Sequence, residues 1–449
     1  MGMKVQEATE TAQLAIGLSS QQPALAADSL LGLWQQAVAD SGERPAFTCL
    51  GQTLSYAEID QLAESIAGYF HTQLKLEAGD RLAVQLPNLL QYPVVVVAAW
   101  KLGLVIVNTN PMYTHRELVH QFNDSGAKAV VVLDQFYNTL QAALPETGIE
   151  TVIVTRAIDL LPQPKKTLLT VVTKLLGKRP SLPAKGIVSF TDMLAGQSAY
   201  PLHKPAYEDI CALQYTGGTT GVSKGVMLTQ GSLMSNVAQT MAMVSAGGRS
   251  VTHFTTVSPL PLYHIYAWML NMGLMPATRG HSVLIPDPRN IPMFVSAIKS
   301  LKFEIFCGLN SLFVTLLQDS KFQKLDFSKL QITLSGGMAL MDAVAHEWHE
   351  ATGCVVSEGY GMTESSPVIS MNPSGSEKIG TAGIPLPGTE IKVVDENGIE
   401  QEVGGVGELC VRGAQVMKGY WQRDAQTAEV IVDGWLHTGD AAQSDEDGF

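Results

Sequence analysis

The sequence predicts an α/β fold that is followed by a smaller antiparallel β part. Up to about Pro385, short apolar runs alternate with stretches of helical periodicity, which is typical of parallel strands joined by helices. After Pro385, runs of alternating polarity are separated by turn sequences such as 395–398 (DENG), which indicate hairpins. The chain has 449 residues, of which 46% are hydrophobic, so we expect about three folding units with large cores.

The expected elements fall into three series along the chain. In the first two, apolar residues at helical spacing alternate with short apolar runs that are typical of strands. The first series comprises helices at 30–39 and 56–70 and strands at 81–86, 129–133 and 151–154. The second comprises strands at 210–215, 282–286, 305–308 and 331–335, and the third comprises hairpin strands at 390–394 and 407–412. The longest apolar run, 94–100, is far shorter than the ~20 residues that cross a bilayer.

Charge and cysteine usage exclude several classes of protein. The 29 basic and 42 acidic residues give a net charge of −13, whereas proteins with nucleic acid as their main partner are usually basic. We therefore expect no nucleic-acid partner. The five cysteines are scattered and the N-terminus lacks a signal-peptide pattern. We expect a cytoplasmic protein without a disulfide framework or a structural zinc site.

Residues 160–185 run against the overall charge. The segment carries six basic residues and no acid, and its apolar residues fall at helical spacing. A basic amphipathic helix can lie on an anionic membrane surface. The alternative, which we favour, is a surface helix that packs its apolar stripe on the core.

The most informative stretch is 215–225 (YTGGTTGVSKG), which follows an expected strand. Its four glycines let backbone N–H groups point inward as a nest for anionic oxygens. Three threonine hydroxyls and the Lys224 ammonium add further donors. The stretch differs from the GxxxxGK[ST] loop of P-loop ATPases and kinases, because Lys224 follows Ser223 and precedes Gly225. The sequence therefore predicts a phosphate-binding loop of another type.

Five further motifs follow this loop along the chain. They are 261–266 (PLYHIY), 335–337 (SGG), 358–364 (EGYGMTE), 380–385 (GTAGIP) and 434–440 (GWLHTGD). Together with the loop, they resemble the AMP-forming acyl-CoA synthetase, or adenylate-forming, superfamily, from about residue 30 to the last residue. Within it, 88–93, 107–117 and 417–423 (MKGYWQR) resemble bacterial long-chain fatty acid–CoA ligases.

The resemblance implies two stacked αβαβα layered subdomains plus a smaller distorted β-barrel subdomain. We expect an N-terminal tail at 1–27, α/β subdomains at 28–205 and 206–385, and the β-barrel subdomain at 386–449. The second α/β subdomain would carry the phosphate loop and an acyl pocket. The resemblance also implies a hinge and a lysine-bearing C-terminal domain after residue 449. We therefore expect this chain to bind ATP but to adenylate poorly.

The implied reaction has two steps and uses ATP, Mg²⁺ and coenzyme A. A carboxylate attacks the α-phosphate of ATP, and the thiol of coenzyme A then displaces AMP. Two unit charges 4 Å apart repel by about 4 kcal/mol at an effective dielectric of 20, so cations and fixed donors must surround the phosphates. The implied catalytic residues are Thr216, Lys224, His264 and Glu364, of which Thr216 and Glu364 would hold Mg²⁺. The implied nucleotide-binding residues are Tyr215, Thr216, Gly217, Gly218, Thr219, Thr220, Gly221, Lys224, Gly336, Gly337, Tyr360, Gly361, Thr363 and Asp440.

Three of these residues have specific implied roles. Tyr360 would stack on adenine, and Asp440 would accept hydrogen bonds from both ribose hydroxyls. His264 would orient an oxygen beside the reacting carboxylate. It would not act as a general base, because a carboxylate nucleophile is already ionised.

The segment after His264 bears on which acid is activated. Residues 251–286 contain no acidic side chain, and an amino-acid substrate would need one to pair its ammonium group. The methionine-rich stretch 265–275 fits an adaptable apolar tunnel, although an ordinary buried helix would look the same. By resemblance, Tyr266 and Trp268 would line a fatty-acid tunnel.

Several alternatives remain open at this point. The chain could be part of a medium-chain or aryl acid–CoA ligase of the same superfamily. It could also be a fragment that binds nucleotide or lipid without turnover. The family includes dimers and membrane-associated members. A homodimer, and a peripheral position on the inner face of the membrane through 160–185, therefore both stay open.

Overall fold

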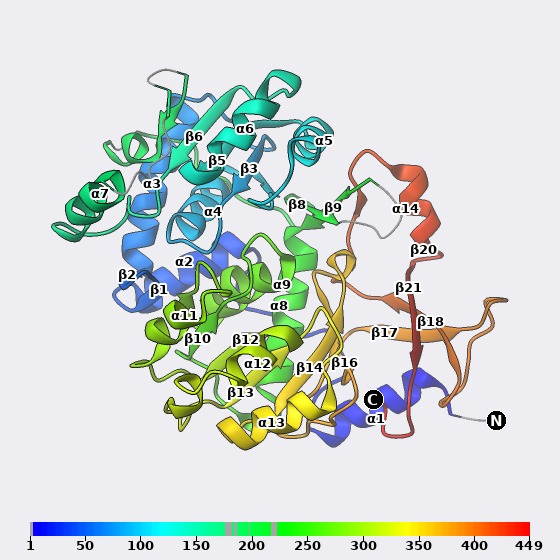
Figure 1. Cartoon of the computed structure of the whole chain (residues 1–449). Helices are drawn as coiled ribbons and strands as arrows, with labels where there is room; N and C mark the ends of the chain where they lie inside the picture. The colour runs from blue at the N-terminus through cyan, green and yellow to red at the C-terminus, as the bar shows by residue number, and fades with distance from the viewer. Residues whose placement is uncertain (1–2, 176–181, 184–185, 197, 217–221) are drawn as a thin grey trace.

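The computed structural model describes residues 3–175, 182–183, 186–196, 198–216 and 222–449. Their strands form two large sheets, stacked in Figure 1, and a small antiparallel sheet beside the lower one. The eight-stranded sheet has the order β19 (Gly419–Tyr420), β9 (Lys224–Thr229), β8 (Ile210–Thr216), β4 (Val105–Asn108), β3 (Arg81–Gln85), β5 (Ala127–Leu133), β6 (Thr151–Thr155), β7 (Val188–Ser189). The nine-stranded sheet has the order β16 (Ile384–Pro385), β15 (Val368–Met371), β14 (Val356–Gly361), β13 (Ile332–Ser335), β12 (Ile305–Gly308), β10 (Thr255–Ser258), β11 (His281–Leu284), β1 (Pro45–Cys49), β2 (Gln52–Ser55). The small sheet has the order β17 (Glu390–Val394), β18 (Val406–Arg412), β21 (Trp435–Gln443), β20 (Ile431–Val432).

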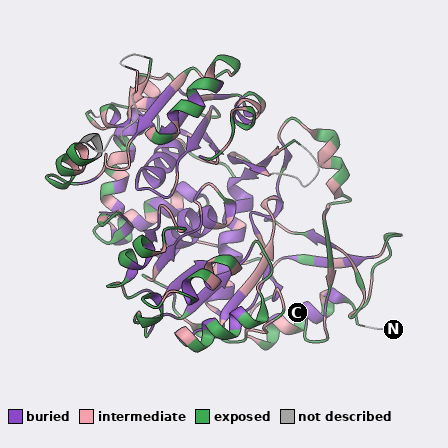
Figure 2. Ribbon diagram, in the orientation of Figure 1, coloured by how far each residue is buried: buried purple, intermediate pink, exposed green. Residues whose placement is uncertain are grey.

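Helices fill the space between the large sheets and cover their outer faces, and the buried interior of these layers is purple in Figure 2. The middle layer contains α2 (Leu30–Ser41), α3 (Tyr56–Thr72), α4 (Gln91–Leu102), α8 (Gln230–Val244) and the helical stretch 265–277. The outer layers contain α5 (His115–Ser125) and α6 (Tyr137–Ala143) on one side, and α11 (Ile291–Ile298), α12 (Asn310–Leu317) and α13 (Asp342–Thr352) on the other. Every residue of α4 is buried, so the apolar run 94–100 is a core helix. The predicted α/β class, with two large layered parts and a smaller β part, is confirmed.

The two large sheets exchange segments of the chain. The hairpin β1–β2 joins the nine-stranded sheet by parallel pairing of β1 with β11. In return, β8 and β9 join the eight-stranded sheet, where β8 pairs with β4. The expected division at residue 206 therefore does not coincide with the boundary between the sheets. Alternating hydrophobicity marks a strand but does not indicate which sheet receives it, because that depends on pairing partners far away in sequence.

The first 27 residues differ from the expected tail. Residues 5–15 form α1 (Val5–Ala15), which packs on β17 and buries Val5 completely. The Gln13 side-chain amide donates to the backbone carbonyl of Pro385 over 2.8 Å. The N-terminal segment therefore covers the core face of the small sheet.

The basic segment also differs from expectation. It contains α7 (Lys165–Leu175), whose apolar side chains Leu168, Val171 and Val172 are exposed. Lys165 and Lys166 donate to the carbonyls of Leu50 and Asp159, which lie on the protein side of the helix. The preferred interpretation, an apolar stripe packed on the core, is therefore wrong for these three residues. Among the helices in the described ranges, none combines the length and apolar character needed to cross a bilayer.

A buried polar network joins the eight-stranded sheet to the segment that follows β10. The Asn88 amide donates to the carbonyls of Ser258 and Leu260 over 3.1 and 2.8 Å and accepts from the Leu262 N–H over 2.8 Å. Gln214 on β8 donates to the Tyr263 carbonyl over 2.7 Å. These bonds satisfy the backbone of an irregular segment that lies between the sheets, away from water.

Tyr92 and Asn108 complete this network. The Tyr92 hydroxyl lies 2.9 Å from the Leu262 carbonyl and 2.5 Å from the Asn108 side-chain oxygen. The Asn108 amide donates to the Gln214 side chain over 2.9 Å. All of these side chains are buried, so each broken bond would leave a polar group without water to replace its partner.

We expect the Asn88→Ala substitution to destabilise the protein by about 3 kcal/mol, because the Leu260 carbonyl and the Leu262 N–H lose their partner in a dry interior. The Ser258 carbonyl keeps a second bond, from the Ile285 N–H. The matched control is Asn123→Ala. Asn123 also donates to one carbonyl and accepts from one N–H, but it is exposed, so water replaces the lost bonds and the cost stays below about 1 kcal/mol. Urea unfolding midpoints compare the two variants, and equal shifts would contradict the prediction.

Candidate active site

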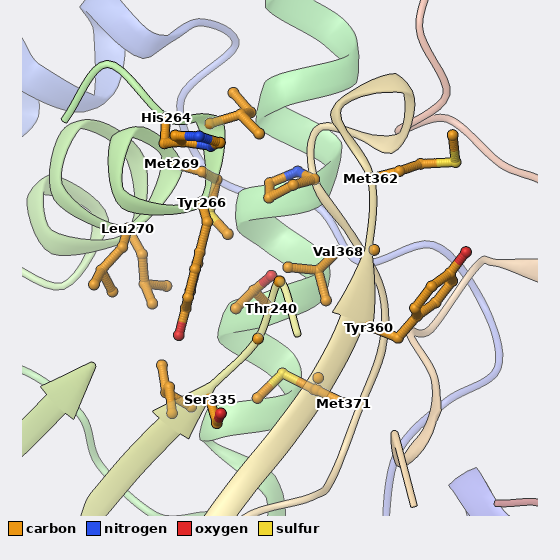
Figure 3. Close-up of a pocket in the computed structure, with 18 of the residues that line it drawn as sticks. Thr240, His264, Tyr266, Met269, Leu270, Ser335, Tyr360, Met362, Val368 and Met371 are labelled. Atoms are coloured by element: carbon orange, nitrogen blue, oxygen red, sulfur yellow. The ribbon is translucent and has the colours of Figure 1, made fainter. Parts of the chain in front are cut away.

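An open cavity lies at the carboxyl ends of the parallel strands β13 and β14, which is where ligands bind in α/β sheets. Its volume is about 200 Å³. Figure 3 shows its lining, which comes from α8, the helical stretch after His264, and strands β13 to β15. Of the predicted site residues, the cavity brings together His264, Tyr266, Gly336, Gly337, Tyr360, Gly361 and Thr363. The remaining lining residues are Thr240, Ile265, Met269, Leu270, Leu274, Leu334, Ser335, Ser357, Gly359, Met362, Pro367, Val368 and Met371.

Two of the glycines in this cavity are required by the backbone. Gly337 has a φ of +80°, which side chains rarely tolerate. A Cβ added to Gly361 would lie 2.0 Å from the carbonyl oxygen of Pro367. Gly337 thus permits the turn after β13, and Gly361 permits the close packing of the end of β14 against Pro367.

His264 lies at the mouth of the cavity and immediately precedes α9 (Ile265–Trp268). Its carbonyl accepts the first helical hydrogen bond, from Trp268. The polar network around Asn88 holds the residues just before it. Although part of the ring reaches solvent, the surrounding protein displaces enough water to lower the pKa of His264 below its ordinary value. A neutral imidazole suits the predicted orienting role, since it donates one hydrogen bond without adding charge.

The two residues predicted to line the substrate tunnel, Tyr266 and Trp268, lie on different sides of their helix. Tyr266 points into the cavity between the helix and the strands (Figure 3). Trp268 is fully buried on another side of the same helix, where its ring meets Trp100 edge-on at 5.8 Å. Because successive helical residues are about 100° apart, two positions along a helix lead away from the cavity. Trp268 therefore does not line this cavity, and its place in a fatty-acid tunnel stays a prediction. The π-helical turn at Met269–Leu274 supplies Met269, Leu270 and Leu274 to the cavity.

Asp440 on β21 does not line this cavity but lines, together with Tyr360, a second one on the side of the small sheet. The Tyr360 hydroxyl donates to its carboxylate over 2.6 Å, which brings the two residues predicted to bind adenine and ribose into contact. Burial and the Asp440 charge raise the pKa of Tyr360, so its hydroxyl stays protonated. Glu408 on the neighbouring strand bonds to the His437 ring over 2.8 Å and accepts from the Gly439 N–H over 2.9 Å. Glu408 thus supports the turn that presents Asp440.

The phosphate loop connects the antiparallel pair β8 and β9. Gly217, Gly218, Thr219, Thr220 and Gly221 lie outside the described residues. Thr216 and Lys224 face each other across the ladder at the two ends of the loop. Because β8 and β9 are antiparallel, the chain leaves the sheet at Thr216 and re-enters it beside that residue at Lys224, whereas a parallel connection would need a crossover.

Two residues that flank the loop, Tyr215 on one side and Ser223 on the other, are anchored on α5. The Tyr215 hydroxyl donates to Asp124 over 2.8 Å, and burial together with this carboxylate raises the pKa of Tyr215. The His120 ring bonds to the Ser223 carbonyl over 2.8 Å. The side chain of Tyr215, which was predicted to bind nucleotide, therefore points toward α5. There it anchors the end of β8 that leads into the loop.

Glu364 lies in the short helix η7 (Thr363–Ser365) and is 6% exposed. Its carboxylate accepts a 2.8 Å hydrogen bond from Tyr420, and the Lys224 ammonium lies 4.2 Å from the centre of the same tyrosine ring. Because Glu364 is only four positions after Tyr360 in the sequence, their Cα atoms are at most ~15 Å apart. The Asp440 end and the Lys224 end of the site are thus connected by one short segment.

Several residues that shape the site were not predicted. Asn88, Gln214, Asp124, Glu408 and Tyr420 each hold a predicted site residue or its neighbours in place. Their partners are far away in sequence, so no local pattern indicates them. Only Asn88 and Tyr420 carried a signal, since they lie in the stretches 88–93 and 417–423 that resemble bacterial long-chain fatty acid–CoA ligases.

We expect the imidazole of His264 to titrate below pH 6.5, because burial disfavours its charged form. The folded state then binds less proton than the unfolded state, so this group costs stability as the pH falls through 6.5. Imidazole NMR shifts followed over pH, assigned with a His264→Gln variant, measure the inflection. An inflection above 6.5 would contradict the prediction.

Comparison with known proteins gives a consistent assignment. A family model described as AMP-binding enzyme matches residues 34–421. The long-chain-fatty-acid–CoA ligases of Haemophilus influenzae and Escherichia coli O157:H7 are each 42% identical to the chain, over 93% and 94% of its length and 75% and 76% of theirs. The crystal structure of a long-chain-fatty-acid–CoA ligase from Archaeoglobus fulgidus matches with a TM-score of 0.81 and 25% identity, covering 96% of this chain and 85% of that one. The chain therefore belongs to the AMP-binding enzyme family, on its long-chain-fatty-acid–CoA ligase branch.

Proposed function

We propose that the chain binds ATP and a long-chain fatty acid and serves their conversion to acyl-CoA. A carboxylate oxygen attacks the α-phosphorus of ATP and pyrophosphate leaves, after which the thiol of coenzyme A displaces AMP and forms a thioester. The observation that carries this proposal is the cavity at β13 and β14, where predicted nucleotide-binding residues meet an apolar wall. The described residues that line it include no Asp, Glu, Lys or Arg, so they offer no counter-ion to a charged substrate tail.

The nucleotide would extend from Asp440 toward Lys224. In this arrangement Asp440 accepts from the ribose hydroxyls and Tyr360 lies against adenine, while Thr216 and Lys224 face the phosphates. The carboxylate of Glu364 and the hydroxyl of Thr216 are oxygen ligands of the kind that Mg²⁺ prefers, and we assign the metal to them. Mg²⁺ would neutralise charge on the phosphates. His264 would donate its N–H to an oxygen at the reacting centre.

The fatty-acid tail would pack against the apolar wall of the cavity, which is formed by Met269, Leu270, Leu274, Leu334 and Met371. Each buried CH₂ contributes about 0.8 kcal/mol, so two carbons change affinity up to about tenfold while they find apolar contact. Flexible methionine side chains on two sides allow the wall to adapt to chains of different length.

We expect stable acyl-adenylate analogues to bind more tightly as the acyl chain grows from 8 to 12 to 16 carbons, by up to about tenfold for each two carbons. Calorimetry with acyl-sulfamoyl adenosines measures the series, and pyrophosphate release with palmitate and ATP measures the reaction. The benzoyl analogue tests the aryl alternative. Equal or tighter binding of the benzoyl analogue than of the 16-carbon one would contradict a long-chain substrate.

The Asp440→Asn variant tests the nucleotide assignment separately. We expect it to weaken ATP binding by ten- to hundredfold, because charge-assisted hydrogen bonds to the ribose are lost. Asp433→Asn, at an exposed turn before the same strand, is the control and should leave ATP affinity unchanged. The assignment fails if both variants bind ATP as the unmodified chain does.

We also propose a peripheral contact of α7 with anionic lipid. Its exposed Leu168, Val171 and Val172 stand on a segment that is basic in sequence, and this combination fits a membrane surface. We expect the Leu168→Glu, Val171→Glu double variant to lose co-sedimentation with phosphatidylglycerol vesicles at low salt. Ile399→Glu, an exposed apolar residue on a distant hairpin, is the control. Equal sedimentation with neutral phosphatidylcholine vesicles would contradict the electrostatic part.

A further inference from the structure

The segment Met417 to Trp421 connects the two ends of the phosphate site. Its short strand β19 pairs with β9, and the N–H groups of Lys418 and Trp421 donate to the carbonyls of Met227 and Gly225. On the other side, the Met417 N–H donates to the Glu364 carbonyl over 2.7 Å. One backbone segment thus binds both β9, which begins at Lys224, and η7, which contains Glu364.

The Tyr420 side chain lies between the two charged groups. It is 4% exposed, its ring lies under the Lys224 ammonium at 4.2 Å, and its hydroxyl donates to Glu364 over 2.8 Å. The cation is therefore placed over the ring face, and the carboxylate at its hydroxyl.

This arrangement gives each charge a partner without joining the two charges. The ring face attracts the ammonium through its quadrupole, and the hydroxyl stabilises the carboxylate. Without the phenol between them, the half-buried Lys224 ammonium and the buried Glu364 carboxylate would be drawn toward an ion pair. Such a pair would neutralise the cation needed by the phosphates and occupy the carboxylate needed by the metal.

We propose that Tyr420 is a positioning residue that holds Lys224 and Glu364 apart and oriented, so that the site takes a metal–triphosphate. This inference rests on the proposed function and assigns to Tyr420 a role that the motif 417–423 alone does not indicate. Tyr420 acts through its two neighbours and does not itself touch the ligand. It should therefore matter for the phosphates and the metal, and not for adenine or ribose.

The test compares ATP with AMP, because AMP lacks the two phosphates that reach the Lys224 end. Tyr420→Phe removes only the hydroxyl and keeps the ring under Lys224, whereas Tyr420→Leu removes both partners. Tyr207→Phe, at an exposed tyrosine, is the matched control. Calorimetric titrations of each variant with ATP over a range of Mg²⁺ concentrations, and with AMP, give the affinities.

We expect Tyr420→Phe to raise the Mg²⁺ concentration for half-maximal ATP binding about tenfold, and Tyr420→Leu to raise it further. AMP affinity should change less than twofold in both, and Tyr207→Phe should change neither ligand. In a Glu364→Gln background, Tyr420→Phe should have little additional effect, because the hydroxyl then has no carboxylate to orient.

Three outcomes would overturn the proposal. Unchanged Mg²⁺ dependence in Tyr420→Phe would show that the hydroxyl does not position Glu364. Equal losses for ATP and AMP would indicate a general disturbance of the pocket. If the unmodified chain binds AMP but not ATP, or neither, the proposed function fails first and this inference with it, which separates the two failures.

Discussion

The site depends on the hydrogen bonding of one irregular segment, the residues between β10 and α9. This backbone lies between two sheets, where water cannot satisfy it, and amide side chains from the eight-stranded sheet take over that task. Asn88 is decisive, because one side chain serves two carbonyls and one N–H. The network ends directly before His264, so the same bonds that join the sheets also place the imidazole at the cavity mouth. Stability and site geometry are therefore coupled at this point.

Local sequence patterns predicted the elements better than their partners. The predicted strand at 305–308 matches β12, and those at 390–394 and 407–412 match β17 and all but the first residue of β18. The hairpin β1–β2 was not predicted, and neither was the sheet that receives β8 and β9. Alternating hydrophobicity indicates which face of a strand is buried. The choice of pairing partner, in contrast, depends on residues that are far apart in sequence. The same limit applies to α1, whose buried face becomes clear only when the small sheet stands beside it.

The site shows a similar division. Motifs identified His264, Gly336, Gly337 and Tyr360, which the cavity brings together, because a backbone turn or an aromatic face leaves a local pattern. Trp268 lies away from this cavity for a geometric reason, since a position in a motif does not give the side of the helix on which the residue lies. The supporting side chains, such as Asp124 and Glu408, had no local signal at all. Their effect is exerted through a neighbour, which only the folded arrangement supplies.

The exchange of strands between the sheets has a consequence for synthesis on the ribosome. Phe47 of β1 pairs with Ser282 of β11, so this hairpin has no parallel neighbour until about 235 more residues have been made. At about 5–20 residues per second, that interval lasts roughly 10–50 s. The eight-stranded sheet is likewise incomplete until β8 reaches β4. Neither layer can close while the chain is short, so the nascent protein exposes unpaired strand edges for most of its translation, and it has a long period in which chaperone binding or aggregation competes with folding.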